Sequence, residues 1–452
     1  MVATIGACSY FAPTYQKPQM NLPTKWQSKN KNVVPIDKNL PYLAWWRKFN
    51  DPLLNQLIES GLVNNANIQS AQANLEASEA QLNTIKLNWI PFVSLFGGYV
   101  NGYNQVPAGN LGSFLAIMPQ YTINFFNTYT QQKQAEHQVK VSEAEISSVK
   151  LAVISQIATG YFAYLSQLQT MQQLKELNSK YLELIAITVN LNKRGLATEI
   201  NLSTLKAQQK LLTGQIILVE KNLIAAQNSL HFLLNQAPGS LPVSEQFADI
   251  NPNQIIPGNL PVSVIAARPD VIKAEEQLKA ANEGISVASS NLLPSVSLNA
   301  FFAQTNNNAG GFNLQTNQTF SGAYANWTIS PSVFGQIDSS KAIFKVALIN
   351  YKNVVNNALH EVDNSLANNN SYNKKMQNDL EALYELSNKV NLQDAMYKRG
   401  VVNYMSVITI QTEQLTLQIN LTETKLQQLI SLVSLYQNLG GGYNYNESSV
   451  AK

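Results

Sequence analysis

The sequence predicts a mainly α-helical fold of two tandem repeats with a small β component. Lys-Arg-Gly ends at Gly195 and again at Gly400, an offset of 205 residues (400 − 195), each time before an apolar, amide-rich stretch. The stretches "NWIPFVSLFGGY" and "NLLPSVSLNAFF" recur at an offset of 203 (294 − 91). Two unrelated landmarks share nearly one spacing, which is too long for a solenoid repeat. We therefore expect a duplicated large unit.

Proline placement outlines the helices of each unit. None of the 17 prolines lies between Pro119 and Pro238 or after Pro331, which leaves proline-free runs of 118 and 121 residues. Proline breaks helix interiors, so these runs can form long helices. We expect paired helices over residues 127–190 and 199–236 in the first repeat and over 332–396 and 404–439 in the second.

The second helix of each pair carries a heptad seam, in which apolar positions alternate steps of three and four. In the second repeat the seam is Met405, Ile408, Thr412, Leu415, Ile419, Thr422, Leu426, Leu429, Val433 and Tyr436. In the first repeat it is Leu202, Leu205, Gln209, Leu212, Ile216, Val219, Leu223, Ala226, Leu230 and Leu233. A second seam of the later helix is Val407, Ile410, Gln414, Leu417 and Leu421. Two seams predict neighbours on both sides, although an ordinary antiparallel coiled-coil bundle remains an alternative.

Four segments near the duplicated prolines alternate apolar with small or polar residues, which is typical of strands. They are "FVSLFGGYVNGY", "QYTINFFNTY", "PSVSLNAFFAQT" and "FSGAYANWTIS", with Gly/Asn-rich connections expected over residues 101–113 and 306–318. Four strands cannot close a membrane barrel, since about eight are needed. Three chains that contribute four strands each could close one. The alternative is a half-buried soluble sheet.

Composition fits the bacterial envelope. Charged residues make up 13% of the chain, against about 25% in ordinary globular proteins. The net charge is only +3 and no basic cluster occurs, so we expect no nucleic-acid partner. No uninterrupted apolar run approaches the roughly 18 residues of a membrane-spanning helix. The chain is expected to span a membrane only as strands.

The single cysteine, Cys8, lies in a lipobox-like context. Ile5 at −3 and the small Gly6 and Ala7 form the environment in which lipoprotein signal peptidase acts before the cysteine is acylated. Several acyl chains hold a protein firmly in a membrane, whereas one does not. The alternative is a free thiol at a frayed terminus. Because the segment before Cys8 is too short for a signal peptide, we expect a truncated or misplaced start.

Together with Cys8, three stretches carry a family resemblance. They are "AWWRKFNDPLLNQLIESGLVNNANIQSAQANLEASEAQL", "ARPDVIKAEEQLKAANEGISVASSNLLPSVSL" and "YKRGVVNYMSVITIQTEQL…LVSLYQNLGGG". The chain resembles, over nearly its whole length, outer-membrane efflux proteins of the TolC/OprM type, in their NodT-like lipoprotein branch. Arg268–Val271 and Leu439–Gly442 are specific in combination.

The resemblance implies a homotrimer with a 12-stranded outer-membrane β-barrel, continued by a long periplasmic α-helical barrel in a Gram-negative bacterium. It also implies a periplasmic adaptor and an inner-membrane pump, usually of the resistance-nodulation-division (RND) class. The expected segments are a lipid-anchored extended N-terminus (1–40), repeat 1 (41–240), a linker (241–262), repeat 2 (263–442) and a C-terminal tail (443–452). Within the repeats we expect hairpins at about 88–126 and 291–330 and tip turns at 193–198 and 398–403.

In such a fold the two Lys-Arg-Gly turns lie at the periplasmic tip and meet the adaptor. The expected docking residues are Lys193, Arg194, Gly195, Leu196, Lys398, Arg399, Gly400 and Val401. Glycine suits a tight helix-to-helix turn because it tolerates positive φ. Glycine as a plain C-cap, with Lys-Arg complementing the helix dipole, is a simpler interpretation that is compatible with docking.

The family closes its channel just after the second tip. The matching positions are Met405, Ser406 and Thr409, with Ile200, Asn201 and Thr204 in the first repeat. Relatives commonly place a Leu and one or two Asp there, and a ring of carboxylates favours cations. This chain has no carboxylate at these positions, so we expect a less cation-selective aperture.

Three explanations of the aperture stay open. In the first, a ring of Met405 side chains forms an apolar constriction. In the second, Glu199 or Glu413 lines the lumen and restores negative charge. In the third, Met405 only packs in the heptad seam.

No enzyme chemistry, cofactor or metal is expected apart from the lipid on Cys8. His137, His231 and His360 are scattered without metal-ligand spacing, and we expect each on a helix surface. Glu275 and Glu276 are adjacent, so they do not face each other on a helix; solvated or tip-stabilising roles are expected.

Two classes of function remain: a passive exit duct driven by a partner pump, and a lipid-anchored scaffold without a pore. Aromatic strands favour the duct, because a scaffold has no use for lipid-facing strands. The duct could serve drug efflux, metal efflux or type I protein secretion. The Cys8 anchor and NodT-like features favour small-molecule efflux over protein secretion.

Overall fold

The computed structural model of the protein describes residues 13–20, 23, 26–28, 40–99, 113–242, 247–252, 262–309, 312–328 and 330–445. Cys8, the expected lipid anchor, lies outside the described residues. So do most of the expected linker and the end of the C-terminal tail.

The described residues form two compact units, and each unit takes segments from both repeats. Unit 1 comprises the described parts of Met1–Met20, Ala73–Ala144 and Ile272–Val354. Unit 2 comprises those of Asn21–Gln72, Glu145–Val271 and Val355–Lys452. The strands belong to unit 1, and the two turns that join the long helices belong to unit 2.

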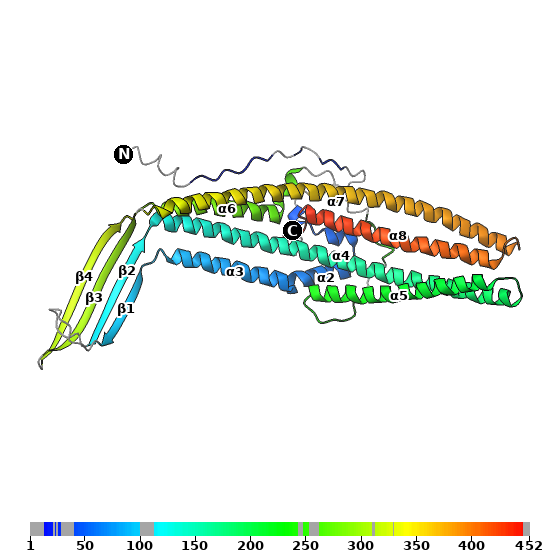
Figure 1. The fold of residues 1–452 in the computed structure, drawn as a ribbon, viewed down its shortest axis with the longest axis horizontal. Coiled ribbons are helices and arrows are strands. Elements are labelled where there is room, and N and C mark those ends of the chain that lie inside the picture. The colour runs from blue at the N-terminus through cyan, green and yellow to red at the C-terminus, as the bar shows by residue number, and fades with distance from the viewer. Residues whose placement is uncertain are drawn as a thin grey trace. The chain divides into compact units, whose positions relative to one another are not determined.

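Each repeat has the order helix, two strands, long helix, helix (Figure 1). The first repeat contains α2 (Pro52–Asn64), α3 (Ala66–Leu87), α4 (Phe125–Lys193) and α5 (Glu199–Leu233). The second contains α6 (Pro269–Ser290), α7 (Ser332–Lys398) and α8 (Tyr404–Asn438). Short 3-10 helices are η1 (Leu40–Tyr42), η2 (Trp45–Phe49) and η4 (Val262–Ala267). The prediction of a mainly α-helical chain with two tandem repeats and four strands is confirmed.

The long helices α4 and α7 have 69 and 67 residues, so each is about 100 Å long at about 1.5 Å per residue. Among the described helices, α4 alone has an 18-residue window apolar enough to cross a membrane, with a mean hydropathy of 1.2. Its middle section contributes Ile154, Tyr161 and Phe162 to the core of unit 2. Packing inside the protein therefore explains part of the apolar character of α4, since 44% of that window is buried.

The four strands form one antiparallel sheet in the order β1-β2-β3-β4. Their bounds are β1 (Phe92–Tyr99), β2 (Ser113–Ile123), β3 (Ser295–Ala309) and β4 (Phe312–Asn326). The prediction of a connection over residues 306–318 was wrong, because the β3–β4 ladder continues to the pair Ala309 and Phe312. Backbone pairing carries these strands through Asn-rich sequence of low intrinsic β propensity.

The core of unit 2 joins η2, which precedes the first α-helix, to the end of α8 and the glycines after it. The Trp45 ring stacks on Tyr436 of α8 with centroids 5.1 Å apart. Gly442 has φ +98°, and a Cβ there would lie 2.6 Å from Trp46 Cζ3. Only glycine combines this backbone conformation with this close approach. The "AWW" and "LGGG" motifs are therefore two halves of one packing interaction.

Arg268 ties three helices of unit 2 together. Its Nη1 donates to the Asn438 carbonyl at 2.7 Å, which satisfies one of the orphan carbonyls at the end of α8. Its Nη2 lies 2.7 Å from a carboxylate oxygen of both Asp270 and Glu361. The Arg-Pro-Asp-Val stretch thus has a structural role at the junction of α6, α7 and α8.

Candidate functional site

The two tip turns have the same geometry. Gly195 follows α4 with φ 76°, and Gly400 follows α7 with φ 73°. The Leu196 amide donates to the Leu191 carbonyl at 2.9 Å, and the Gly195 amide donates to the Asn192 carbonyl. The second tip repeats this pattern with Val401 on Met396 and Gly400 on Tyr397. Both turns are Schellman motifs, which require a left-handed residue where each glycine lies.

Each tip also caps the helix that follows it. Thr198 Oγ1 accepts from the Asn201 amide, and Asn403 Oδ1 accepts from the Ser406 amide at 2.9 Å. These bonds satisfy amides that a helix N-terminus leaves unpaired. Local sequence therefore builds both turns in the same way.

The expected docking residues are exposed at both tips. Leu196 is 72% and Val401 65% exposed, so each turn presents an apolar side chain to solvent. Lys193, Arg194 and Arg399 are also exposed, while Lys398 Nζ lies 2.6 Å from Asp394 Oδ2. Each tip thus offers one apolar group surrounded by basic side chains, which is a suitable surface for a protein partner.

The expected aperture residues of α8 lie within its first two turns and have different surroundings. Met405 is half-buried, and its Sδ accepts from Thr188 Oγ1 of α4 at 3.6 Å. The Ser406 hydroxyl donates to Asn403 Oδ1 within the cap. Thr409 is exposed, and its hydroxyl donates to the Met405 carbonyl. Met405 therefore packs against α4, as the seam-packing explanation requires, while Thr409 faces solvent in the protomer.

The matching residues of the first repeat are all exposed. Ile200, Asn201 and Thr204 lie on the first turns of α5. Thr204 Oγ1 donates to the Ile200 carbonyl, as expected for a threonine inside a helix. In the protomer this region offers an apolar and a hydroxyl-bearing surface without charge at the positions predicted from sequence.

A bond that the sequence analysis missed lies beside Met405. Tyr404 Oη donates to Glu183 Oε1 of α4 at 2.6 Å. This bond raises the pKa of Tyr404, since it stabilises the protonated phenol. The Tyr397 ring lies 5.1 Å from the Tyr404 ring, which brings α7 to the same place. The partners are 221 residues apart, and no local pattern connects them.

The two carboxylates of the alternative explanation have different environments. Glu413 Oε2 lies 3.3 Å from Lys389 Nζ of α7, and both side chains are about half exposed. Glu199 is exposed in the first turn of α5. Glu413 is therefore partly neutralised within the protomer.

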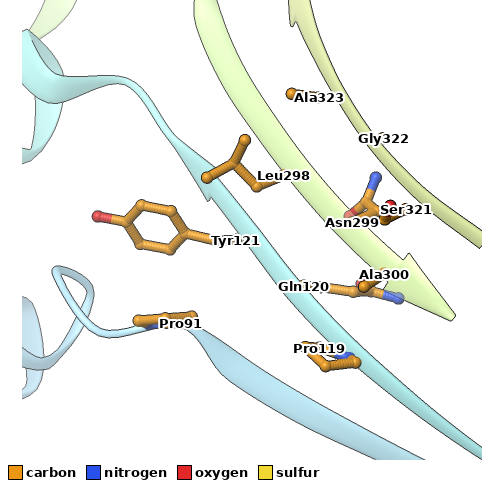
Figure 2. Close-up of a pocket in the computed structure, with 10 residues that line it drawn as sticks. All are labelled: Pro91, Pro119, Gln120, Tyr121, Leu298, Asn299, Ala300, Ser321, Gly322 and Ala323. Carbon is orange, nitrogen blue, oxygen red and sulfur yellow. The ribbon is translucent and has the colours of Figure 1, made fainter. Parts of the chain in front are cut away.

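The sheet carries a shallow hollow of about 540 Å³ on one of its faces. Figure 2 shows its lining, which comes from β2, β3 and β4 and from the residue before β1: Pro91, Pro119, Gln120, Tyr121, Leu298, Asn299, Ala300, Ser321, Gly322 and Ala323. Tyr121 Oη donates to the Trp89 carbonyl, which fixes the tyrosine beside the start of β1. The lining has no charged group that could serve in catalysis.

The remaining ionisable groups have structural contacts. His137 Nδ1 lies 2.7 Å from Glu276, and Lys279 Nζ contacts both Glu275 and Glu276. Burial acts to raise the pKa of Glu276, but hydrogen bonds from Lys279 and His137 outweigh it, so the pKa is lowered. The expectation of a solvated Glu276 was wrong, because α4 packs over it.

The histidines differ from one another in burial. His231 is buried, against the expectation of a surface position, and its Nδ1 lies 3.2 Å from Gln236 Oε1. His360 is exposed. Within the described residues, no three His, Cys, Asp or Glu side chains gather as metal ligands would.

Comparison with known proteins identifies the family. The model of the family described as "Outer membrane efflux protein" matches residues 57–236 and 260–441. The chain belongs to the outer membrane efflux protein family. The two matched ranges include both hairpins and both tip turns of this efflux protein.

Individual relatives span nearly the whole efflux protein. The "Probable efflux pump outer membrane protein TtgC" of Pseudomonas putida is 26% identical over 470 residues, which cover 97% of this chain and 93% of the relative. The "Probable outer membrane lipoprotein SilC" of Salmonella typhimurium is 22% identical, and the match covers 97% of this chain and 96% of the relative. The open state of the Neisseria gonorrhoeae MtrE outer membrane channel has a TM-score of 0.81 at 20% identity, covering 96% of this chain and 98% of that one. The protein is an outer-membrane efflux component with the fold of these channels.

Proposed function

We propose that three copies of the chain form a passive exit duct, which carries small molecules such as drugs across the outer membrane. The observation that carries this proposal is the family match over both repeats, including all four strands and both tips. The duct would have no chemistry of its own, and a partner pump would supply the driving force.

The open sheet supports assembly into a trimer. β1 and β4 are its two edge strands, and an unpaired edge seeks another strand. If β4 of one copy pairs with β1 of the next, three copies give 12 strands, enough to close a membrane barrel.

The outward face of α5 supports the same assembly. Six apolar side chains on this helix are more than half exposed in the protomer. They are Ile200, Leu211, Ile217, Leu218, Ile224 and Phe232. A patch of this kind is a sign of an interface, and a neighbouring copy would cover it within a helical barrel.

The tips would dock to a periplasmic adaptor that is connected to an inner-membrane pump of the RND class. Two tips per chain would give six per trimer, each with an exposed Leu196 or Val401 beside basic residues. Anchoring through lipid on Cys8 is part of the proposal, and the lipoprotein name printed for SilC agrees with it.

At the aperture, we propose that closure involves the start of α8, where Met405 packs on Thr188 and Tyr404 bonds to Glu183. These contacts hold the start of α8 against α4. The Met405 ring would be the apolar constriction, with Glu199 and Glu413 as the alternative charged lining.

The test is conductance of the purified full-length protein in planar bilayers. The parent should give discrete small channels and Met405→Ala larger ones. Ile200→Ala is the matched control, since Ile200 and Met405 each lie five residues after a tip glycine (200 − 195 and 405 − 400). Silence from a protein whose mass in detergent is not that of a trimer would favour the scaffold. Cation selectivity that collapses in Glu413→Gln or Glu199→Gln would replace the Met405 explanation with the charged one.

A further inference from the structure

The middle of the sheet carries apolar residues on both faces. In β2 the run Phe114–Pro119 ("FLAIMP") has no polar residue, and in β3 neither does Ala300–Ala303 ("AFFA"). The two runs are adjacent, since Ile117 pairs with Phe302. Successive side chains point to opposite faces, and a water-filled barrel normally alternates apolar outward with polar inward. In β2 and β3, whichever face lines the interior is therefore apolar at this level.

The side chains nearer the helices identify the aqueous face. Gln120 and Asn299 pair across β2 and β3 and point to the same face as Phe301. On this face the Thr122 and Ser297 hydroxyls lie 2.9 Å apart, and Asn299 Nδ2 donates to Tyr324 Oη. Polar side chains that hydrogen-bond to one another belong on the water-facing side of a membrane barrel.

The opposite face, which carries Phe302, is apolar in β2 and β3 at the same levels, although β4 places Thr319 and Ser321 on it. On it Tyr121 pairs with Leu298, and Ile123 pairs with Val296. Ile117 and Phe302 are exposed, whereas Ala116 and Ala303 on the Phe301 face are buried. The Phe302 face therefore suits lipid, and the Phe301 face suits the interior.

On the Phe301 face, Met118, Phe301 and Phe320 lie side by side, and Phe114 lies four residues before Met118 along β2. We call these four side chains the aromatic belt. Phe301 and Phe320 are directly paired on β3 and β4. Met118 lies next to Phe301, where the β2–β3 ladder is interrupted between Ile117 and Gln120. Pro119 explains the interruption, because proline has no amide hydrogen to donate.

Two glycines let the rings of the belt lie against the sheet. A Cβ on Gly98 would be 3.0 Å from the Phe114 ring, and one on Gly322 would be 3.2 Å from the Phe320 ring. Each ring therefore covers a glycine and presents a face away from the backbone. Aromatic faces stack favourably on other aromatic rings.

We propose that the aromatic belt lines the duct and transiently binds uncharged aromatic molecules as they pass. This inference rests on the proposed trimeric duct. The described residues of the four strands include no Asp, Glu, Lys or Arg, so this section offers no partner for a charged solute. Apolar rings that face water are poorly wetted, and an aromatic solute that covers them relieves this cost.

The test measures block of single channels in planar bilayers by benzyl alcohol, with cyclohexylmethanol as the non-aromatic probe of similar size. In the parent, benzyl alcohol should block at several-fold lower concentration than cyclohexylmethanol. Phe301→Ser should weaken benzyl alcohol block about fivefold, as expected from loss of a ring contact. Phe302→Ser is the matched control, because Phe302 is the next residue on the opposite face, and block should not change.

Phe301→Leu removes the aromatic ring but keeps a large apolar side chain, so it separates the two effects. The strand should still fold. It should remove the preference for benzyl alcohol while retaining channels. Equal block of the parent, Phe301→Ser and Phe301→Leu would overturn the belt. So would loss of block in Phe302→Ser alone, since that result reverses the faces. Absence of channels in the parent would instead overturn the proposed duct on which the belt rests.

Discussion

Helices α5 and α8 are matching parts of the two repeats, yet only α8 is covered on two sides. Each has 35 residues and follows a tip turn with a side-chain cap. In α8 the predicted first seam is buried from Ile408 to Tyr436 except for the half-buried Ile419. In α5 the predicted seam is buried or half-buried, but the rest of the helix exposes large apolar side chains.

The difference follows from the neighbours of each helix. α8 bonds to α4 through Thr422 and Gln173, and to α7 through Gln414 and Ser387. α5 bonds to α4, with Gln209 Nε2 donating to Asn178 Oδ1. In α8 the first seam is mostly buried and the second is buried or half-buried by the same chain, whereas α5 leaves one apolar face exposed in a single copy.

The largest expected effect comes from truncating equivalent side chains. Leu429 and Ile224 each lie 29 residues after a tip glycine (429 − 400 and 224 − 195), but Leu429 is 0% and Ile224 55% exposed. Leu429→Ala should cost about 3 kcal/mol of folding free energy, because it leaves a cavity in the core. Ile224→Ala should lower the stability of the proposed trimer more than that of the fold. Thermal unfolding and mass in detergent measure the two effects, and equal losses of fold stability would contradict the comparison.

A second difference is the buried lysine of α8. Lys425 Nζ donates to the Ala248 carbonyl at 2.6 Å, and burial lowers the pKa of this ammonium to about 8. The unfolded chain keeps a lysine pKa of about 10.4, so between about pH 8 and 10.4 it binds more protons than the folded chain. Stability should therefore rise with pH across this window, by an amount on the order of 2 kcal/mol.

The matched variants are Lys425→Met and Lys221→Met, the latter on an exposed part of α5. Lys425→Met should flatten the rise in unfolding temperature between pH 8 and 10, while Lys221→Met should keep it. If the unfolding temperature of Lys425→Met still rises between pH 8 and 10, the pH dependence must come from another ionisable group.

A third test concerns the start of the two helices. Tyr404→Phe removes the 2.6 Å hydrogen bond to Glu183. The contact between α8 and α4 should become weaker by about 1 to 2 kcal/mol, since the bond is to a charged group. Channel conductance or open probability should rise. Glu199 occupies the equivalent position of α5, one repeat offset of 205 residues earlier (404 − 205). Glu199→Gln should leave channel conductance and open probability unchanged. Unchanged conductance in Tyr404→Phe would show that the bond does not restrain the tip.

The smallest effect is expected for the exposed pair of Lys389 and Glu413, at 3.3 Å. Exposed ion pairs contribute about 0 to 1 kcal/mol and are screened by salt. Glu413→Gln should therefore change unfolding temperature slightly, and only at low ionic strength. A large loss at high salt would mean that the pair is shielded from solvent in the assembled protein.

Several site features could be read from the sequence because their causes are local. The turns at Gly195 and Gly400 need left-handed backbone, and the caps Thr198 and Asn403 lie at fixed spacing from them. The bond between Tyr404 and Glu183 could not be read, since each residue alone resembles an ordinary helix-surface residue. The burial of His231 and Glu276 was missed for the same reason.

The sequence by itself determined the two repeats, the helix lengths, the four strands and the tips, because proline, glycine and apolar periodicity act over short distances along the chain. Only the tertiary structure decided which heptad seams are buried and which polar side chains of α4 and α8 form hydrogen bonds. It also decided that the Trp46 ring lies so close to residue 442 that only glycine fits there. These features depend on packing between residues hundreds of positions apart. The same heptad pattern can therefore give a covered helix in α8 and a half-covered one in α5.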